Sequence, residues 1–374
     1  MRIGFDAKRA FHNFTGLGNY SRTLIHSLAN SFPEHHYLLF NPKSSKSIRF
    51  HQSSIQEVKP TGMLGSLFPS VWRSRWMLQE VKENCSLYHG LSHELPYGAS
   101  RLSIPKVVTM HDLIFESSPQ QYRKTDVLIY RRKFRYAAEV SNQIVAISEV
   151  TKRDLIHYYQ IPEQKIKVVY QACDQRFYTR CTPQQREAIR KRYSLSSPYW
   201  LFVGSIIERK NLLRVCEALS KLDATMPLLV VGKGEQFKQR VIDFLKEKKL
   251  TQQVIFLEDH FTSSQIYQDL PVLYQMAFAL IYPSLKEGFG LPVLEAMASG
   301  CPVITSNHTS MTETGPNTAL LVEPLHTESI LEAMKQLMLQ PDQREQFIQT
   351  GIQAALQFTP DKCAQHMMNL YLAL

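Results

Sequence analysis

Two glutamates, Glu287 and Glu295, frame a short glycine-containing segment that follows the apolar run Phe278–Tyr282. Gly288 and Gly290 make this segment a loop whose backbone amides can face a ligand. A helix pattern follows, and Glu295 lies about one turn inside it among apolar and small residues. An ionised carboxylate is costly to bury there without partners, and the vicinal hydroxyls of a ribose or another sugar would supply two donors. The segment therefore indicates a sugar or nucleotide site.

Two adjacent cations, Arg209 and Lys210, follow the apolar run Trp200–Val203 and precede a helix pattern that starts near Asn211. Asparagine is favourable as a helix N-cap, and helix N-termini attract anions through their unpaired N–H groups. Two cations and a row of amides would then point at one place, which in physical terms is a diphosphate site. A solvated basic loop is the alternative interpretation.

Two glycines, Gly16 and Gly18, lie between the apolar run Ile3–Phe5 and a helix pattern from about Asn19. Glycine tolerates positive φ and a close backbone approach, so amides at this helix start would accept an anion. The third glycine of a dinucleotide-binding loop is absent from the sequence. Ligand contact and a plain tight turn are equally compatible with the pair.

His111 and Asp112 end the apolar run Val107–Met110. Ligands of open α/β sheets bind outside the carboxyl ends of the strands, and this imidazole stands at such an end. A histidine there suits hydrogen bonding or charge transfer with a substrate. Because the chain has 13 histidines, a purely structural histidine is the competing interpretation.

Short apolar runs alternate with amphipathic stretches along the chain. The expected strands are Ile3–Phe5, Tyr37–Phe40, Leu87–His89, Val107–Met110, Ile144–Ile147, Ile166–Val169, Trp200–Val203, Leu228–Val231, Val254–Leu257, Phe278–Tyr282, Val303–Thr305 and Leu320–Val322. The expected helices include Asp126–Ala138, Gln236–Lys248, Gln265–Tyr274 and Ser329–Leu339. This alternation is typical of parallel sheets covered on both faces. We therefore expect an α/β protein with two doubly wound Rossmann-like domains facing each other across a cleft.

A polar stretch from residue 172 interrupts this alternation and marks the domain boundary. We expect an N-terminal domain over residues 1–175, a linker over 176–198 and a C-terminal domain over 199–358. Residues 359–374 form an amphipathic helix pattern that is expected to pack back on the N-terminal domain.

The formal net charge is +10 and is unevenly spread. Residues 1–175 carry 23 Lys and Arg against 14 Asp and Glu, a net of +9, whereas the remainder carries 20 against 19, a net of +1. This asymmetry indicates an anionic partner for the N-terminal half. Nucleic acid, a membrane surface and a phosphorylated ligand each fit the charge alone.

The composition excludes several classes of protein. With 44% hydrophobic residues the chain is not disordered, and no apolar run approaches the ~18 residues of a transmembrane helix. The six cysteines form no CxxC pair and no zinc-like cluster, so we expect free thiols and no metal site. The sequence starts without a secretory-signal pattern, which favours a cytoplasmic location.

Two segments combine aromatic and basic residues. The segment 64–84 contains Trp72 and Arg73 among other residues of both kinds, and residues 130–136 contain four cations and three aromatic side chains. This composition is typical of a surface at the membrane interface. A helix packed through its tryptophans, with solvated arginines, explains it as well, and no nucleic-acid-binding motif accompanies it.

Taken in their order along the chain, these motifs resemble those of the family 4 retaining glycosyltransferases, whose two Rossmann domains form the B fold. The segment from Glu287 to Glu295 is similar to the E-x7-E motif of that family, and Arg209-Lys210 is similar to its phosphate-binding pair. Three further positions resemble its N-terminal glycine loop, its strand-end histidine and its nucleotide-contacting turn: Gly16-Leu17-Gly18, His111 and Gly232. The resemblance covers essentially the whole chain, and bacterial polysaccharide mannosyltransferases look most similar.

The resemblance implies transfer of a hexose, with retention at the anomeric carbon, from a nucleotide diphosphate sugar to a saccharide or polyprenyl-linked acceptor. Mannose from GDP-mannose fits the similarity best. Glu295 would bind ribose hydroxyls, and Arg209 and Lys210 would neutralise the leaving diphosphate. Glu287 would orient the hydroxyls of the donor sugar, and His111 would contact that sugar from the N-terminal domain. The other implied donor-site residues are Ser205, Gly232, Gly288, Phe289, Gly290 and Leu291, and Gly16, Leu17 and Gly18 would form a loop for the acceptor or its phosphate.

The chain contains no Asp-x-Asp sequence, which argues against the metal-dependent class of glycosyltransferases. No metal and no cofactor besides the donor substrate are expected. A UDP-sugar-dependent enzyme of the same family and a nucleotide-sugar 2-epimerase of the same fold are alternatives, and the epimerase would turn over the donor without an acceptor. The charge excess of the N-terminal half then fits an anionic, polyprenyl-diphosphate-linked acceptor at the inner membrane face, reached by a cytoplasmic, peripheral enzyme rather than one that binds nucleic acid.

Overall fold

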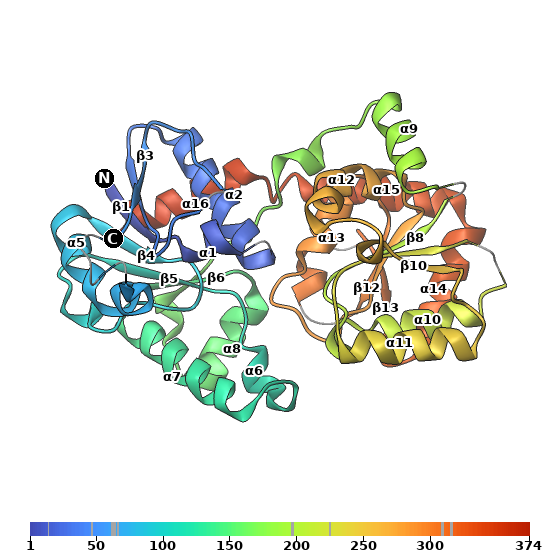
Figure 1. Ribbon diagram of the computed structural model, residues 1–374, viewed down its shortest axis with the longest axis horizontal. Helices are drawn as coiled ribbons and strands as arrows, with labels where there is room; N and C mark the ends of the chain where they lie inside the picture. The colour runs from blue at the N-terminus through green and yellow to red at the C-terminus, as the bar shows by residue number, and fades with distance from the viewer. Residues whose placement is uncertain are drawn as a thin grey trace. The chain divides into compact units, whose positions relative to one another are not determined.

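The computed structural model describes residues 1–13, 15–45, 48–60, 65, 67–195, 198–223, 226–307, 310–314 and 317–374. The chain divides into two compact units. Unit 1 comprises Met1–Cys173 and Thr359–Leu374, and unit 2 comprises Asp174–Phe358. Each unit contains one parallel sheet with helices on its faces (Figure 1). The expected α/β class is thus confirmed.

Unit 1 is built on a seven-stranded parallel sheet of order β3-β2-β1-β4-β5-β6-β7. Its strands are β1 (Arg2–Asp6), β2 (His36–Phe40), β3 (Ile55–Val58), β4 (Leu87–Gly90), β5 (Lys106–Met110), β6 (Gln143–Ala146) and β7 (Ile166–Val168). Its α-helices are α1 (Lys8–His12), α2 (Gly16–Ser31), α4 (Pro69–Val71), α5 (Met77–Asn84), α6 (Ile114–Ser117), α7 (Lys124–Val140), α8 (Glu149–Tyr159) and α16 (Pro360–Leu372). A π-helical segment, η1 (Trp72–Trp76), joins α4 to α5.

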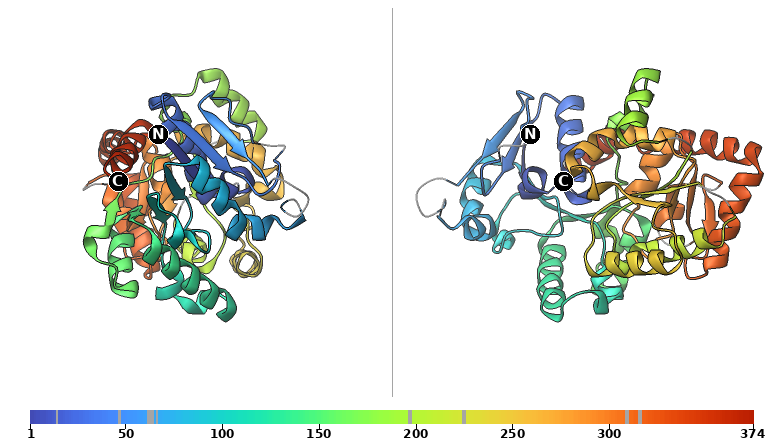
Figure 2. Two further views of the ribbon diagram at one scale, coloured as in Figure 1. Left: turned by 90° about the vertical axis from the view of Figure 1, so that its left-hand side faces the viewer. Right: turned by 45° about the vertical axis from the view of Figure 1, so that its right-hand side comes forward.

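The sheet of unit 1 is buried on both faces, because successive side chains of each strand point to opposite sides. In β1 and β2, Phe5 and Leu39 face one core cluster together with side chains of α2 and α16. Leu38 and Phe40 of β2 face the opposite cluster, which includes side chains of α5, α7 and α8. Helices on both sides of this sheet are visible in the further views (Figure 2).

Unit 2 is built on a six-stranded parallel sheet of order β10-β9-β8-β11-β12-β13. Its strands are β8 (Trp200–Val203), β9 (Leu228–Val231), β10 (Val254–Phe256), β11 (Ala279–Tyr282), β12 (Val303–Ser306) and β13 (Leu320–Val322). Its α-helices are α9 (Pro183–Arg192), α10 (Leu212–Ser220), α11 (Gln236–Glu247), α12 (Ser263–Met276), α13 (Leu291–Ala298), α14 (Thr327–Leu339) and α15 (Pro341–Ala355). Short 3₁₀ helices include η5 (Gln175–Tyr178), η6 (Glu208–Lys210) and η7 (Leu257–Asp259).

All twelve strands expected from the apolar runs are present, and one additional strand, β3, was missed. Its sequence, Ile-Gln-Glu-Val, has two polar residues in its centre, and both Gln56 and Glu57 are exposed. Among the described strands β3 pairs with β2 alone, at the edge of the sheet, so it does not need a continuous apolar pattern.

The expected linker 176–198 belongs to unit 2 as folded structure. Its first part lies in η5, and α9 starts with a capping box in which Thr182 and Gln185 satisfy each other's backbone N–H groups. Helix α9 packs on α12, and Tyr193 donates a hydrogen bond to Asp269 of that helix. Polar composition suggested a linker here, but polar residues on the exposed face of a docked helix produce the same composition.

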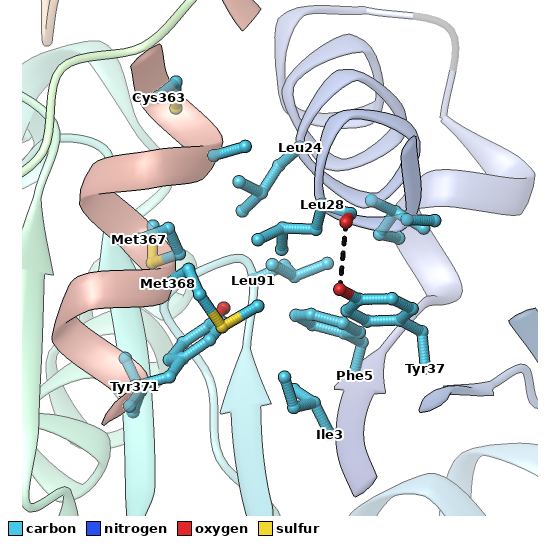
Figure 3. Close-up of a cluster of buried hydrophobic side chains, with 14 of the residues drawn as sticks. Ile3, Phe5, Leu24, Leu28, Tyr37, Leu91, Cys363, Met367, Met368 and Tyr371 are labelled. Atoms are coloured by element: carbon cyan, nitrogen blue, oxygen red, sulfur yellow. Dashed lines mark hydrogen bonds between the residues drawn. The ribbon is translucent and has the colours of Figure 1, made fainter. Parts of the chain in front are cut away.

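Helix α16 packs on α2 within unit 1 (Figure 3). Met367, Met368 and Tyr371 point from α16 toward Leu24 and Leu28 of α2 and toward β1. The buried face repeats at helical spacing, which is why the pattern was visible in the sequence. Helix α16 therefore covers one face of the sheet of unit 1, which also contains strand β1.

Candidate active site

The carboxyl ends of β8 and β11 form the natural ligand position of unit 2. In the strand order β10-β9-β8-β11-β12-β13, the direction of winding reverses between β8 and β11. Loops that leave adjacent strands at such a switch point diverge to opposite faces of the sheet and leave room for a ligand. The loop 204–211 follows β8, and the loop 283–290 follows β11.

Glu287 joins these two loops through a cluster of charges. Its Oε1 accepts hydrogen bonds from Arg209 Nη1 and Lys210 Nζ, each at 2.7 Å. Ser284 Oγ donates a short hydrogen bond to the same oxygen. Burial acts to raise the pKa of Glu287, but Lys210 and Arg209 outweigh it and hold this pKa below its ordinary value. The carboxylate is therefore ionised and collects two cations at the switch point.

The ammonium group of Lys210 is held from a second side as well. It donates a short hydrogen bond to the hydroxyl of Tyr282 and lies 4.6 Å from the centroid of that ring. Tyr282 ends β11 and is fully buried, and burial together with Glu287 raises its pKa well above the ordinary value. Tyr282 is thus a neutral phenol that fixes the direction of the lysine without neutralising it.

Asn211 fixes the loop after β8 but does not cap α10 as expected. It has φ +67°, and its side chain accepts no capping hydrogen bond from the backbone N–H groups of α10. Its Oδ1 accepts from the side-chain Nη1 of Arg214 at 2.9 Å. Its Nδ2 instead donates to Pro283 O at 3.0 Å and to Pro324 O at 2.6 Å. The first turn of α10 therefore lacks a cap from Asn211, and the amide side chain ties the β8 loop to the β11 loop.

The last glycine of the loop after β11, Gly290, is the N-cap residue of α13. Gly290 has φ +100°, a left-handed conformation that favours glycine. Pro292 stands in the first helical turn, where no N–H partner is needed. No side chain caps the N-terminus of α13 within this described loop. Its first amides, including that of Leu291, are suited to an anion.

Glu295 lies in the second turn of α13 and is only 9% exposed. Tyr274 OH from α12 donates to its Oε2 at 3.1 Å. Burial raises the pKa of Glu295 to about 7. The described hydrogen bond of Glu295 thus goes to α12 and not to the Glu287 cluster. The two glutamates of the motif therefore occupy different environments. Glu287 is ionised among cations, whereas Glu295 has a pKa near 7 in an apolar setting.

Arg176 is a site residue that the sequence did not reveal, because it lay in the expected linker. It stands in η5, and its Nη1 donates to Tyr267 O at 2.8 Å, with the guanidinium 3.8 Å from the centroid of the Tyr267 ring. Its Nε and Nη2 are buried without a hydrogen-bond partner among the described residues. Its charge acts to lower the pKa of Glu295, so these two side chains are electrostatic neighbours. Arg176 and Glu295 together would suit a ligand that both accepts and donates hydrogen bonds.

Gly232 brings the turn after β9 into contact with the loop after β8. A Cβ on Gly232 would lie 1.8 Å from Gly204 O, and its φ of +153° is also a glycine conformation. Ile206 N donates to Lys233 O at 2.7 Å across the same junction. Ser205 is exposed beside it. The close approach of the two backbones therefore explains why a glycine stands at position 232.

His111 of unit 1 follows β5 and is 4% exposed. Its Nε2 donates to Leu91 O at 2.9 Å, and its Nδ1 accepts from Gln171 Nε2 at 2.8 Å. Burial lowers its pKa to about 4, so the ring is neutral at pH 7. Both ring nitrogens are hydrogen-bonded within unit 1, so contact with a substrate hydroxyl requires exchange of one of these two partners.

The expectation for the N-terminal glycine loop needs correction. Helix α2 begins at Gly16 rather than near Asn19, and neither Gly16 nor Gly18 has positive φ. Gly18 N donates to Asn13 Oδ1 at 3.2 Å, and a Cβ on Gly18 would lie 1.8 Å from Asn13 O. Gly18 thus allows the start of α2 to pack closely against the backbone of Asn13. Gly16 and Leu17 remain at the helix start, Gly16 with open space around it, whereas residue 14 lies outside the described residues.

The first aromatic and basic segment separates into buried and exposed parts. Trp72 is 2% exposed and belongs to a core cluster, and Arg73 is ion-paired. Leu67, Phe68 and Trp76 are exposed. Residues 64 and 66 lie outside the described residues.

Helix α7 carries the second segment on a solvent-facing side. Leu128 and Ile129 are 64% and 50% exposed, and Arg132 and Arg135 are exposed on the same helix. In the part of the chain that the structure describes, no helix combines the length and the apolar character needed to cross a bilayer. All six cysteines are free thiols, and no described group of three His, Cys, Asp or Glu residues is arranged to hold a metal ion.

Two family models match successive parts of the chain. Residues 14–177 match "Glycosyltransferase Family 4", and residues 185–354 match "Glycosyl transferases group 1". Similar curated proteins include O-antigen chain mannosyltransferase B of Escherichia coli, 26% identical over 390 residues, covering 99% of both chains. O-antigen chain mannosyltransferase RfbU of Salmonella typhimurium is 27% identical over 299 residues, covering 78% of this chain and 77% of RfbU.

Solved structures share the fold at low sequence identity. HepE of Anabaena in complex with UDP-glucose has a TM-score of 0.78 at 17% identity and full coverage of both chains. A glycosyltransferase from Rickettsia africae has a TM-score of 0.76 at 19% identity, covering 99% of this chain and 97% of its own. The solved structures show that the chain has their two-domain fold, and the two family models, which together span nearly the whole chain, show that it belongs to the family 4 glycosyltransferases.

Proposed function

We propose that this glycosyltransferase moves mannose from GDP-mannose to a saccharide or lipid-linked saccharide, with retention at the anomeric carbon and without a metal ion. The observation that carries the proposal is the Glu287 cluster, in which two cations meet at the switch point of unit 2. The mannosyltransferase relatives support the choice of sugar. The absence of an Asp-x-Asp sequence supports metal independence.

Arg209 and Lys210 would take the diphosphate of the donor. Each is aimed by Glu287, and Lys210 also by Tyr282, so little side-chain ordering is required when the anion arrives. As the bond between sugar and diphosphate breaks, negative charge grows on the leaving oxygen. Prepositioned cations in a partly buried site stabilise that charge more than they stabilise the intact donor. The amides of Gly290 and Leu291 would add donors to the same group.

The donor sugar would lie against the loop 287–290. Glu287 and the backbone of Gly288 and Phe289 would accept and donate hydrogen bonds to its hydroxyls, and Ser205 lies exposed at the loop after β8. His111 would hydrogen-bond a hydroxyl of a substrate that reaches unit 1, after giving up Leu91 O or Gln171. Its neutral form at pH 7 suits a hydrogen bond better than proton abstraction.

A feature of unit 2 favours a guanine base. Glu258 follows β10, and its Oε2 is buried without a hydrogen-bond partner among the described residues, while its Oε1 accepts from Ser263 Oγ at 3.3 Å. β10 is two strands from β8 in the sheet, on the same carboxyl edge. Guanine presents two adjacent N–H donors that match a carboxylate, whereas uracil presents one. An unpartnered carboxylate oxygen at this edge supports a GDP donor.

The acceptor would be anionic and would reach the enzyme at the inner face of a membrane. The net charge of +9 in residues 1–175 supports an anionic acceptor. The exposed Leu128 and Ile129 beside Arg132 and Arg135 on α7 are suited to an anionic bilayer surface. These two features support our proposal of a peripheral enzyme, and a polyprenyl-linked saccharide is the acceptor that we propose for it.

The donor proposal is tested by nucleotide binding. We expect GDP to raise the melting temperature of the protein more than UDP does, because a ligand at about a hundred times its dissociation constant stabilises by ~2.7 kcal/mol. Glu258→Gln should reduce the difference between GDP and UDP, and Glu139→Gln, an exposed carboxylate of unit 1, should leave it unchanged. Equal shifts for both nucleotides in the wild type would contradict guanine selection. Turnover of GDP-mannose without an acceptor would point to an epimerase instead.

A pH dependence follows if Glu295 binds the ribose. Hydroxyl donors favour the ionised carboxylate, and the pKa of Glu295 is about 7 in the unliganded protein. GDP binding should therefore release part of a proton near pH 7, and the affinity should rise as the pH increases from about 6 to 8. Calorimetry in two buffers of different ionisation enthalpy measures this release. The phosphate groups of GDP also titrate, so Glu295→Gln is the control, and an unchanged proton release in that variant would remove the ribose assignment.

A further inference from the structure

Unit 1 has a cavity of about 610 Å³ at its own switch point. In the order β3-β2-β1-β4-β5-β6-β7 the winding reverses between β1 and β4. Asp6 ends β1, Lys43 follows β2, and Glu94 follows β4, and all three line the cavity. The cavity thus occupies the carboxyl edge of the sheet, where open α/β sheets bind their ligands. All residues that line the cavity belong to unit 1, whereas the proposed donor site belongs to unit 2.

Arg73 holds two carboxylates of the cavity at once. Its Nε donates to Asp6 Oδ2 at 2.9 Å and its Nη2 lies 2.6 Å from the same oxygen, while its Nη1 donates to Glu94 Oε2 at 2.9 Å. Lys133 Nζ donates to the other oxygen of Glu94 at 3.3 Å. Burial acts to raise the pKa of Glu94, but Arg73 and Lys133 outweigh it and lower this pKa. Arg73 therefore fixes both carboxylates, and lone pairs that these contacts leave over can accept hydroxyl donors.

The cavity carries more positive than negative charge. Four cations and two carboxylates line it, an excess of two positive charges. Arg73 and Lys133 are paired with the carboxylates, whereas Lys8 and Lys43 form no ion pair with any carboxylate of the described residues. Burial lowers the pKa of Lys8 most, and the charges of Arg73 and Arg9 act in the same direction, whereas Glu94 and Asp6 act against them. An anion next to Lys8 would add to the stabilisation that these two carboxylates give to its charged form.

One wall of the cavity is apolar and aromatic. The rings of Tyr97 and Tyr136 lie 5.3 Å apart at an angle of 40°. Tyr136 OH accepts from Gly98 N at 2.7 Å, which fixes its ring. Pro96 and Leu95 extend the same wall. Rigid aromatic and proline faces beside fixed carboxylates match the two kinds of surface that a sugar ring presents, its C–H faces and its hydroxyl edge.

We propose that this cavity binds a saccharide carrying a negatively charged group, with the hydroxyls on Asp6 and Glu94 and the anion on Lys8 and Lys43. The inference rests on the proposed glycosyltransferase reaction, for which the ligand is the acceptor. It narrows the acceptor to a sugar with a phosphate or carboxylate close to its ring. A phosphate ester and a uronic acid share this chemistry, and the experiment distinguishes them.

The experiment compares four probes on the full chain at low ionic strength by ligand-detected NMR: glucose 1-phosphate, glucuronate, glucose and inorganic phosphate. Glucose 1-phosphate or glucuronate should bind more tightly than both glucose and inorganic phosphate, and the better of the two identifies the anion. Combining Lys8→Gln with Lys43→Gln should weaken that binding about tenfold or more and remove the advantage over glucose. Lys82→Gln, an exposed lysine on α5, is the matched control and should change nothing.

Two further measurements distinguish binding in this cavity from binding at the proposed donor site. Binding of the anionic sugar should persist in Lys210→Ala, and GDP binding should persist in the variant that lacks Lys8 and Lys43. The proposal is overturned if the anionic sugars do not bind, if inorganic phosphate binds as well as they do, or if binding disappears in Lys210→Ala instead. A protein that binds the anionic sugar but no nucleotide would contradict the proposed function and leave the cavity assignment intact.

Discussion

Replacing Lys210 by alanine is expected to lower the rate of glycosyl transfer at saturating donor by about 10²- to 10³-fold. Lys210 is one of two cations on Glu287, and it is also fixed by Tyr282. Its ammonium is therefore directed before the donor arrives, and it would meet the charge that develops on the leaving diphosphate. Removal loses an interaction that is stronger in the transition state than in the ground state, so kcat should fall more than the donor KM rises.

Matched variants separate this effect from a general loss of structure. Lys221→Ala removes an exposed lysine of the same unit that is paired with Glu328, and it should leave the rate unchanged. Lys210→Arg keeps a positive charge and should recover part of the rate. Circular dichroism should show a folded protein in each case. A wild-type rate in Lys210→Ala would refute the assignment of this residue to the diphosphate.

Removing residues 359–374, which contain helix α16, is expected to prevent unit 1 from folding. The helix buries Met367, Met368, Leu370 and Tyr371 on the face of unit 1 that contains α2 (Figure 3). At about 1.5–3 kcal/mol for each large buried side chain, these contacts supply roughly 10 kcal/mol. That amount is comparable to the whole stability of a typical domain, about 5–15 kcal/mol. The truncated chain should therefore be insoluble or lack the cooperative thermal transition of unit 1.

Single substitutions on α16 test the same interface quantitatively. Tyr371 OH is 2.6 Å from His89 Nδ1, and both groups are buried, so Tyr371→Phe should cost about 1–3 kcal/mol. Met367→Ala should cost about 2–5 kcal/mol through the cavity it leaves. Leu372→Ala is the control, because Leu372 is 63% exposed on the same helix. Urea denaturation gives these differences, and an unaffected stability in Met367→Ala would contradict the packing of α16 in the core.

Apolar periodicity was sufficient to predict most of the fold. Twelve strands were recognised because a parallel sheet buried on both faces needs nearly continuous apolar runs. The same argument fails at the edge strand β3, where Gln56 and Glu57 face solvent. It also fails in residues 176–198, whose exposed polar face was mistaken for a linker although η5 and α9 are folded parts of unit 2.

Motif spacing predicted which residues of unit 2 could carry chemistry but not how they meet. Glu287, Arg209 and Lys210 were singled out by residue type and position, yet Glu287 lies more than 70 residues from the two adjacent cations in the chain. Their contact depends on β8 and β11 being neighbours in the sheet, which is a property of strand order. Nothing in the sequence indicated that Glu287 would be ionised while Glu295 titrates near pH 7, because burial and neighbouring charges set both values.

The amino-acid sequence by itself determined the α/β class, the two halves of the chain, their unequal charge and the residues that could bind a sugar nucleotide, because these properties depend on local pattern and composition. Only the tertiary structure decided that Gly18 packs against Asn13, that both nitrogens of His111 are occupied, and that Asp6, Arg73 and Glu94 line one cavity. The physical reason is that hydrogen-bond partners, burial and the local field arise from residues far apart in the chain, which only the packed sheet brings together.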